Sequence, residues 1–290
     1  MIGIVLAGGT GSRLWPITKS VSKQLLPLFN KPLVYYPIAT LMLAGIREII
    51  IITTPKDQAS FISLLGDGSN YGVKFHYKIQ NNPEGLAQAF IISESLIEGK
   101  KTALILGDNF FYGTGLGFQL SKYQNVSGAQ IFGYRVTDPH NYGVLEINDS
   151  GKIISIEEKP TKPKSNIAIT GLYFYDENVL AISKRIKPSI RGELEITSVN
   201  QEYLRNGQLN ALTLPRGTTW LDTGSFLSLH EASIFVKTLE ERQGTRISCL
   251  EEISFRKGWI SKNHLESFMK NCNDQELVRY LISVIEEFQN

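Results

Sequence analysis

The sequence predicts an α/β fold: a Rossmann-like, mostly parallel sheet with helices on both faces, an antiparallel insertion and a small C-terminal helical region. The first observation is that short apolar runs alternate with segments of helical period through roughly the first 140 residues, which is typical of βαβ units. The second is that the pattern changes after residue 142 to strands joined by short turns. A helical tail is expected from about residue 243.

The individual elements follow in chain order. Runs rich in β-branched and apolar residues predict strands at 2–6, 48–53, 73–79, 102–106 and 129–134. Apolar residues at helical spacing predict helices at 86–97 and 229–239. A hairpin of 143–147 and 152–156 is predicted around the turn residues 148–151, followed by strands at 168–175 and 209–214. Acidic residues in a first turn, with Gly207 past the end, predict a helix at 193–204.

Composition excludes several classes of protein. The 290 residues carry 30 Lys and Arg against 28 Asp and Glu, a net charge of +2, which argues against a polymeric nucleic acid as partner. No apolar run approaches the ~18 residues of a membrane span, and no secretory signal is apparent, so we expect a cytoplasmic protein without a membrane partner. The two cysteines form no C-x-x-C pair, which argues against a disulfide scaffold or a cysteine-rich zinc site.

In open α/β sheets the ligand lies beyond the carboxyl ends of the strands, so the loops there are the first candidates for a site. The loop after the first strand is rich in glycine and hydroxyl groups: Gly8, Gly9, Thr10, Gly11 and Ser12. Glycines let backbone N–H groups approach an anion, and Arg13 supplies a positive charge, so the loop predicts a phosphate site. A tight structural turn is the alternative. Leu14 and Arg13 exclude the dinucleotide fingerprint and the Walker A motif, respectively.

Two aspartates are candidate metal ligands. Asp108 follows a predicted buried strand, and Asp222 stands in a similar setting much later in the chain. A charge at such a position is costly unless it is paired or bound to a cation, and Mg²⁺ takes one or two carboxylates together with substrate phosphates. Spacing alone leaves open that each aspartate caps a turn or a helix.

Nine blocks, in order between about residues 2 and 260, resemble the bacterial glucose-1-phosphate thymidylyltransferases of the sugar nucleotidyltransferase family: 8–14, 22–27, 41–45, 85–90, 106–109, 138–143, 155–160, 191–197 and 220–224. His140-Asn141 departs from the Glu-Arg pair common in the family, and the last fifty residues diverge more than the rest. The resemblance implies a catalytic domain of residues 1–242, with a nucleotide-binding part of about 1–135 and a sugar-binding part of about 136–224. The tail, 243–290, is then expected to serve oligomerisation and regulation.

The family's reaction is attack of the phosphate of α-D-glucose 1-phosphate on the α-phosphorus of dTTP, which gives dTDP-glucose and pyrophosphate. The resemblance implies Mg²⁺ ligation by Asp108 and Asp222, and catalytic roles for Arg13, Lys23, Asp108, Lys159 and Arg191. It implies a nucleotide site of Gly8, Gly9, Thr10, Gly11, Ser12, Arg13, Lys23, Gln24, Gln80, Gly85 and Asp108. It implies a sugar-phosphate site of Asn109, Tyr142, Gly143, Glu158, Lys159, Thr170, Gly171 and Arg191.

The resemblance also implies a homotetramer, a place in the synthesis of dTDP-L-rhamnose or another deoxysugar, and feedback inhibition by dTDP-L-rhamnose through Arg216 and Arg256. Three alternatives stay open. A uridylyltransferase differs only in the methyl group of the base, which gives ~1–3 kcal/mol of discrimination. A non-catalytic nucleotide-sugar-binding regulator could share the fold. A Rossmann-type oxidoreductase is disfavoured because the third glycine of its fingerprint is absent.

Overall fold

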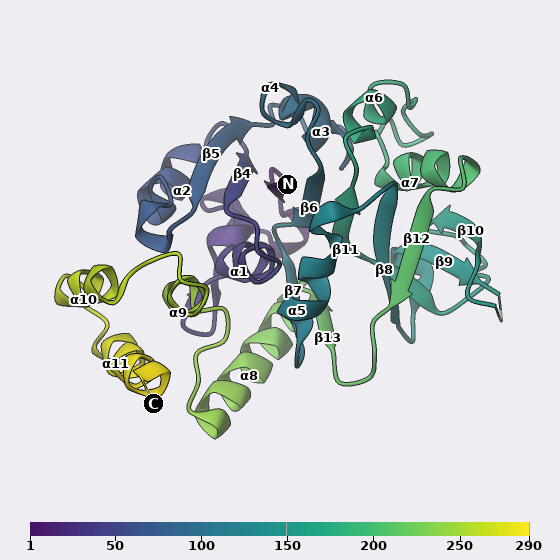
Figure 1. The fold of residues 1–290 in the computed structure, drawn as a ribbon. Helices are drawn as coiled ribbons and strands as arrows, with labels where there is room; N and C mark the ends of the chain where they lie inside the picture. The colour runs from purple at the N-terminus through teal and green to yellow at the C-terminus, as the bar shows by residue number, and fades with distance from the viewer. Residues whose placement is uncertain (149, 290) are drawn as a thin grey trace.

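The computed structural model describes residues 1–148 and 150–289, which form a mixed sheet with helices packed on its two faces (Figure 1). Neighbouring strands of the sheet follow the order β10-β9-β11-β6-β1-β4-β5, and β8 pairs with both β11 and β12. Its strands are β1 (Ile2–Ala7), β4 (Glu48–Thr53), β5 (Lys74–Ile79), β6 (Thr102–Leu106), β8 (Ala129–Arg135), β9 (Gly143–Ile147), β10 (Ile153–Glu158), β11 (Ile167–Tyr175) and β12 (Leu209–Thr213). The predicted strands are confirmed.

The central parallel strands β1, β4 and β6 are buried on both sides, whereas the edge strand β5 is partly exposed. β1 pairs in parallel with β4 and β6, and β5 continues the parallel arrangement beyond β4. Four consecutive isoleucines, residues 49–52, are fully buried in β4, as expected for a strand that is covered on both faces. Alternate side chains of one strand therefore enter different cores: Ile51 packs in the first and Ile52 in the second.

Each core is closed by its own helices. The first lies under α1 (Tyr35–Leu43), α2 (Gln58–Leu65), α5 (Leu116–Ser121) and α9 (Leu250–Arg256). The second lies under α3 (Gln88–Ile92), α4 (Glu94–Ile97), α6 (Val179–Ser183) and α7 (Ile196–Arg205). Figure 1 shows these two groups on opposite sides of the sheet. Helices on both faces, as predicted from the alternating pattern, are thus confirmed.

The antiparallel insertion is also confirmed. β11 runs antiparallel to β6 and β8, and it carries the β9–β10 hairpin at its outer edge. The backbone N–H of Asn148 donates to the carbonyl of Lys152 at the hairpin's end (2.9 Å); Asp149 of the predicted turn lies outside the described residues. The hairpin therefore extends the sheet on the side away from β5.

Two helix predictions are wrong in detail. The predicted helix 86–97 is divided at Ser93, whose backbone (φ −91°, ψ 0°) leaves the helical region. The predicted helix 193–204 begins only at Ile196. The backbone before it is held outside the helix, because the N–H of Leu194 donates to the carbonyl of Glu84 (2.7 Å) and its own carbonyl accepts from the N–H of Ala87 (3.0 Å), and Glu195 is extended. Glu193 consequently lies before the helix rather than in its first turn.

Two short ribbons and a long helix complete the body. The ribbons, which were not predicted, are β2 (Pro27–Leu28) with β3 (Lys31–Pro32), and β7 (Asn109–Tyr112) with β13 (Thr219–Asp222). The predicted helix 229–239 extends over α8 (Phe226–Gln243), because a reciprocal capping box of Ser225 and Ser228 starts it early and Gly244 (φ +65°) ends it late.

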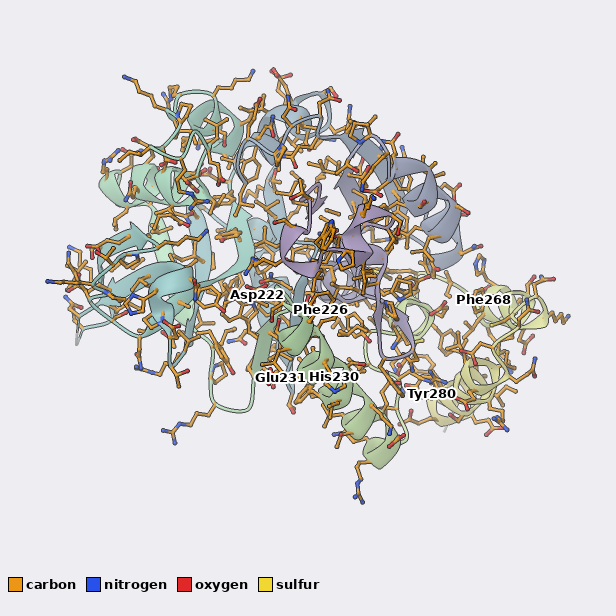
Figure 2. All side chains as sticks on the ribbon, turned by 180° about the vertical axis from the view of Figure 1, so that it is seen from behind. Asp222, Phe226, His230, Glu231, Phe268 and Tyr280 are labelled. Atoms are coloured by element: carbon orange, nitrogen blue, oxygen red, sulfur yellow. The ribbon has the colours of Figure 1, made fainter. Side chains whose placement is uncertain are left out.

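The tail consists of α9, α10 (Lys262–Lys270) and α11 (Gln275–Gln289). Leu250 and Ile253 of α9 belong to the first core of the sheet, and Ser254 Oγ donates to the carbonyl of Tyr71 (2.6 Å). Phe268 of α10 and Tyr280 of α11, labelled in Figure 2, pack against a separate small core. The boundary at residue 242 stays a prediction. Among the residues described, no helix has the length and apolarity needed to cross a bilayer.

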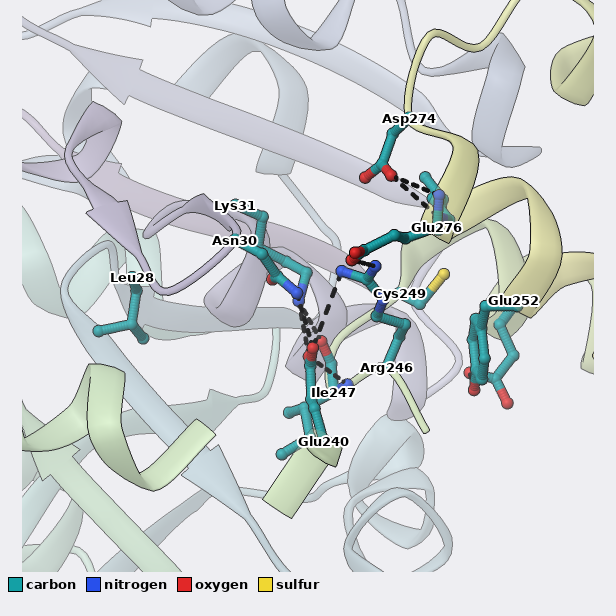
Figure 3. A network of polar contacts seen from close by, with 12 residues as sticks. Leu28, Asn30, Lys31, Glu240, Arg246, Ile247, Cys249, Glu252, Asp274 and Glu276 are labelled. Carbon is teal, nitrogen blue, oxygen red and sulfur yellow. Dashed lines mark hydrogen bonds and ion pairs between the residues drawn. The ribbon is translucent and has the colours of Figure 1, made fainter. Parts of the chain in front are cut away.

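A buried carboxylate ties the end of α8 to the β2–β3 ribbon (Figure 3). Glu240, 6% exposed, accepts hydrogen bonds from Lys31 Nζ (3.0 Å), Asn30 Nδ2 (2.6 Å) and the backbone N–H of Ile247 (2.8 Å). Arg246 Nη1 lies 3.9 Å from the same carboxylate. A single side chain thus fixes the chain that leads into the tail against the ribbon that follows the loop of residues 23–26.

Replacing Glu240 should therefore destabilise the protein strongly. Glu240→Ala leaves Lys31 charged and buried without its partner, so we expect the free energy of unfolding to fall by about 3–5 kcal/mol. Equilibrium unfolding in urea at neutral pH measures this change. Glu241→Ala, on the same helix but exposed, is the matched control and should have a small effect. Equal midpoints for the two variants would refute the structural role of Glu240.

Candidate active site

The candidate site is a cleft at the carboxyl ends of the parallel strands. β1 leads into the glycine loop, β5 into Gln80 and β6 into Asp108. Two cavities of about 210 and 260 Å³ adjoin there and share Leu86, Leu106, Asp108 and Glu193 in their walls. This is the place that the topology of an open α/β sheet predicts for a ligand.

The predicted site residues divide between the two cavities. The smaller cavity, called here the base cavity, is lined by Gly9, Gln24, Gln80, Gly85 and Asp108. The larger, called here the sugar cavity, is lined by Arg13, Asp108, Asn109, Tyr142, Gly143, Glu158, Lys159, Gly171, Arg191 and Asp222. The predicted residues outside both walls are Gly8, Thr10, Gly11, Ser12, Lys23 and Thr170. The functional roles of all these residues stay predictions.

The β7–β13 ribbon brings the two candidate metal ligands together. Asp222 pairs with Asn109, the residue directly after Asp108. The next residue, Thr223, fixes the same place twice: its Oγ1 donates to the carbonyl of Asp108 (2.8 Å), and so does its backbone N–H (3.3 Å). The two aspartates therefore reach one cavity although they are far apart in sequence.

The two carboxylates differ in their electrostatic environment. Burial alone would raise the pKa of Asp108, but Lys23, whose Nζ lies 2.7 Å from Asp108 Oδ2, outweighs burial and holds that pKa below its usual value. Burial raises the pKa of Asp222, and the negative charge of Asp108 raises it further, against the weaker effects of Lys23 and Arg13. The negative charge of Asp222 is therefore less well compensated by the protein than that of Asp108.

This pair fits a hard divalent cation. A cation beside Asp222 would remove the repulsion between the carboxylates, and oxygen is the ligand atom that Mg²⁺ prefers. Throughout residues 1–148 and 150–289, the acidic, histidine and cysteine side chains form no cluster of three or more suited to hold a metal. A Mg²⁺ ion here would consequently complete its coordination with water and substrate phosphates.

Two glycines of the loop are required for different reasons: Gly8 because the Gln80 side chain packs against it, and Gly11 because of its positive φ. A Cβ at Gly8 would lie 2.2 Å from Gln80 Oε1, so only glycine lets that amide lie against the loop. Gly11 (φ +61°) precedes a short 3₁₀ turn, Ser12–Leu14, which places Arg13 on the cleft. Gly9, Thr10 and Ser12 are exposed. The loop thus leaves its outer side open to an anion.

The sugar cavity holds acidic and basic groups that already contact one another. Arg191 Nη2 donates to Glu193 Oε2 (2.8 Å), and Glu158 Oε2 accepts a short hydrogen bond from Thr197 Oγ1. Lys159 adopts a left-handed φ of +42°, and its N–H donates to the carbonyl of Tyr142 (3.0 Å). Such strain in a non-glycine residue is common at functional sites.

Asn109 joins three elements at the base of the sugar cavity. Its Oδ1 accepts from Trp220 Nε1 (2.6 Å) and from the N–H of Gly171 (3.1 Å), while its Nδ2 donates to Asp108 Oδ1 (2.9 Å). Asn109 is 2% exposed. The side chain therefore orients Asp108, beyond the sugar contact predicted from the sequence.

The side chain of Thr170 does not line the sugar cavity, and its predicted contact with a sugar stays a prediction. Ile169, Gly171 and Tyr173 of β11 line the sugar cavity, whereas Thr170 does not. Because successive side chains of a strand point to opposite faces, the Thr170 hydroxyl lies on the other side of the sheet, fully buried. Any contact of this residue with a ligand would have to come from its main chain.

Sequence reasoning missed two residues of the cleft wall, Thr197 and Trp220, and one residue behind it, Gln88, which is hydrogen-bonded to Gln80. Thr197 and Gln88 lie inside the blocks that carry the resemblance, but a threonine or glutamine at helical spacing has no signal of its own. The indole of Trp220 fixes Asn109, and its ring packs on Tyr142 (centroids 5.3 Å apart). Among the described wall residues of the cleft there is no histidine. His230 lies on α8, farther from Asp222 than Phe226 at the start of that helix (Figure 2).

Comparisons with known proteins agree with this geometry. The family model described as nucleotidyl transferase matches residues 2–238. The chain is 53% identical to the glucose-1-phosphate thymidylyltransferase of Mycolicibacterium smegmatis over 286 residues, 99% of each chain. It is 50% identical to the enzyme of that name from Neisseria gonorrhoeae, over 98% of this chain and 99% of the other.

Solved structures show the same likeness. A putative glucose-1-phosphate thymidylyltransferase from Bacillus anthracis, in complex with a sucrose, aligns with a TM-score of 0.75 and 40% identity, covering 81% of this chain and 95% of that one. A UDP-glucose pyrophosphorylase complexed with UDP-glucose aligns with a TM-score of 0.72 and 26% identity, covering 82% and 98%.

The raised pKa of Asp222 predicts that this residue costs stability. An acid with a raised folded pKa is destabilising once it ionises, so Asp222→Asn should raise the melting temperature at neutral pH. The gain should disappear as the pH falls through the folded pKa of Asp222 towards 3.8, its ordinary value, because wild-type Asp222 is then protonated as well. Calorimetric scans across this range measure the effect.

Asp67→Asn is the control of opposite sign, because hydrogen bonds from Ser69 lower the pKa of that exposed carboxyl. Its replacement should not stabilise the protein at neutral pH. A lower melting temperature for Asp222→Asn than for the wild type at neutral pH would contradict the electrostatic assignment.

Proposed function

The chain belongs to the nucleotidyl transferase family, and from this premise we propose that it transfers a thymidylyl group from dTTP to α-D-glucose 1-phosphate. A phosphate oxygen of the sugar attacks the α-phosphorus, and the bond to the bridging oxygen of the pyrophosphate breaks. The observation that carries the proposal is the single cleft in which the base cavity and the sugar cavity meet at Asp108. The names of relatives about 50% identical support the choice of substrates.

The nucleophile needs no general base. The second pKa of a phosphate monoester is ~6, so it is mostly a dianion at neutral pH. The difficulty is instead the repulsion between two polyanions, and positively charged groups that hold them in line address this. The residues for this role are Arg13, Lys159 and Arg191, which all line the sugar cavity.

Asp108 and Asp222 would hold Mg²⁺, which when bound supplies positive charge to the nucleotide phosphates. Lys23 keeps Asp108 ionised and therefore ready to act as a ligand. Asn109 holds one oxygen of Asp108 in place, which limits the directions in which that carboxylate can turn. The loop of Gly9, Thr10 and Ser12 offers backbone N–H groups on the side of the nucleotide.

Arg191 must change partners to hold the sugar phosphate. It is 43% exposed and hydrogen-bonded to Glu193, and its Nη1 also lies 3.9 Å from Glu158 Oε1 and 3.7 Å from Glu195 Oε1, so a dianion has to displace these ion pairs. Thr197 holds Oε2 of Glu158, and Oε1 becomes available to accept from a sugar hydroxyl once Arg191 turns to the phosphate. The sugar cavity thus combines a cationic side for the phosphate with an anionic side for hydroxyls.

We propose further that the product enters dTDP-L-rhamnose or another deoxysugar pathway, and that the enzyme is a homotetramer under feedback inhibition by dTDP-L-rhamnose. In support, Arg256 lines a further cavity, of about 500 Å³, between α5 and α9. Arg216 is exposed and does not line this cavity, so within one chain the two arginines named from the sequence do not meet.

The activity is tested by pyrophosphate release with dTTP, UTP, ATP, CTP and GTP, each with a panel of sugar 1-phosphates. We expect turnover with dTTP and glucose 1-phosphate, loss of turnover with EDTA, and recovery with Mg²⁺. UTP belongs in the panel because a UDP-glucose pyrophosphorylase shares the fold.

Asp222→Asn should lower kcat by several orders of magnitude while the variant stays folded. Absence of turnover with every pair would sink the proposal, and full activity of Asp222→Asn would sink the metal assignment.

Feedback inhibition is tested by adding dTDP-L-rhamnose to the same assay. The wild type should be inhibited, and Arg256→Ala should need a higher concentration for half-inhibition, because a cation at the wall of the α5–α9 cavity is lost. Arg205→Ala, an exposed arginine of α7, is the control and should behave like the wild type. An unchanged rate of the wild type with the inhibitor would end this part of the proposal.

A further inference from the structure

Two buried amide side chains face the base cavity. Gln80, 4% exposed, follows β5, and Gln24, 5% exposed, lies in the 3₁₀ turn Lys23–Leu25. An amide has an accepting oxygen and a donating NH₂ group, and rotation by half a turn exchanges them. What such a cavity recognises therefore depends on which end of each amide is turned to the ligand.

The orientation of Gln80 is fixed by hydrogen bonds that begin at Glu84. The carboxylate of Glu84 can only accept, and its backbone N–H can only donate. Gln88 Nε2 donates to Glu84 Oε2 (2.8 Å), and Gln88 Oε1 accepts from the N–H of Glu84 (3.3 Å). Reversing the Gln88 amide would break both contacts, so Gln88 has one orientation.

That orientation passes to Gln80. Because Gln88 turns its oxygen to Gln80, the group of Gln80 that meets it must be the NH₂, and Nε2 donates to Gln88 Oε1 at 2.6 Å. Gln80 Oε1 then lies against Gly8, and no residue of the described chain donates a hydrogen bond to it. Gln80, which lines the cavity, thus keeps an acceptor that no described residue uses.

Gln24 complements this acceptor with a donor. Its Oε1 accepts from Ser22 Oγ (2.7 Å), and no residue that the structure describes accepts from its Nε2. The two amides line the same cavity, so the protein presents one acceptor and one donor there. An imide matches this pattern, because its N–H donates and the carbonyl beside it accepts.

We propose that Gln88 and Glu84 are positioning residues that hold Gln80 in the orientation that accepts from the N3–H of an imide base. The site would then select thymine and uracil over cytosine, which has a lone pair at N3 and an amino group beside it. A freely rotating amide could serve either base. The inference rests on the proposed function for the nature of the substrate and assigns the selection of its base to residues that do not touch it.

Gln80 and Gln24 would not contact the methyl group of thymine, because both amides meet only the imide edge of the base. These two side chains therefore do not distinguish thymine from uracil nucleotides. Discrimination between them falls to the apolar wall formed by Leu6, Pro83, Leu86 and Leu106. Selection for the imide edge and selection for the methyl group are thus separate, and a single comparison of dTTP with CTP would not distinguish them.

The test compares dTTP, dUTP and dCTP in the wild type, in Gln88→Met and in the double variant Glu84→Gln/Gln88→Glu. Methionine removes the acceptor at similar size. In the double variant a glutamate at position 88 keeps an acceptor for Gln80, and a glutamine at position 84 supplies the donor between the two side chains, so the orientation of Gln80 is kept. In Gln88→Met the ratio of kcat/KM for dTTP to that for dCTP should fall roughly tenfold or more. The double variant should keep the wild-type ratio, and the KM for glucose 1-phosphate should not change in either variant.

Calorimetric titration of the same nucleotides in Mg²⁺ buffer separates this inference from the proposed function. Preferential binding of dTTP that is lost in Gln88→Met supports the inference even if no turnover is found. A role of Gln88 in structure alone would lower kcat/KM for both nucleotides equally, and an unchanged ratio overturns the inference. A wild type that binds dCTP as well as dTTP, or binds neither, also overturns it.

Discussion

The pairing of β7 with β13 is the contact on which the candidate site depends. Each strand has four residues, yet their register sets Asp222 opposite Asn109 and hence beside Asp108. Thr223 and Trp220 secure that register through hydrogen bonds to the Asp108 carbonyl and the Asn109 side chain. A shift by one residue would turn every side chain of β13 to the other face, so the two carboxylates meet only in this arrangement.

The main sheet could be predicted from the sequence, whereas these ribbons could not. A run such as Ile49–Ile52 is apolar enough to be buried whatever its neighbours are, so local pattern suffices. β7 and β13 have no such pattern, and each becomes a strand only through a partner distant in the chain. The same reason explains the late start of α7, because the backbone of Leu194 is held by its hydrogen bonds to Glu84 and Ala87 rather than by its own residue type.

The residue types of the cleft could be inferred from motifs, but their electrostatic balance could not. The sequence predicts a concentration of cations, yet Lys23 is paired with Asp108 and Arg191 with Glu193. The free cleft is therefore closer to neutral than a count of its arginines and lysines indicates. Motif position also carries no information on side-chain direction, which is why Thr170 was placed in the site although strand alternation turns its hydroxyl away.

The contribution of α9 to the main core has a consequence for synthesis of the protein on the ribosome. Leu250 and Ile253 occupy the core that begins with Val5, so residues near the two ends of the chain complete the same apolar layer. Most of the sheet can pair while translation continues, but that layer stays open to solvent until α9 has left the exit tunnel. The nascent chain therefore exposes the apolar surface of α1 that binds α9 for nearly the whole of its elongation. This surface is the one that a chaperone would have to cover until α9 is synthesised.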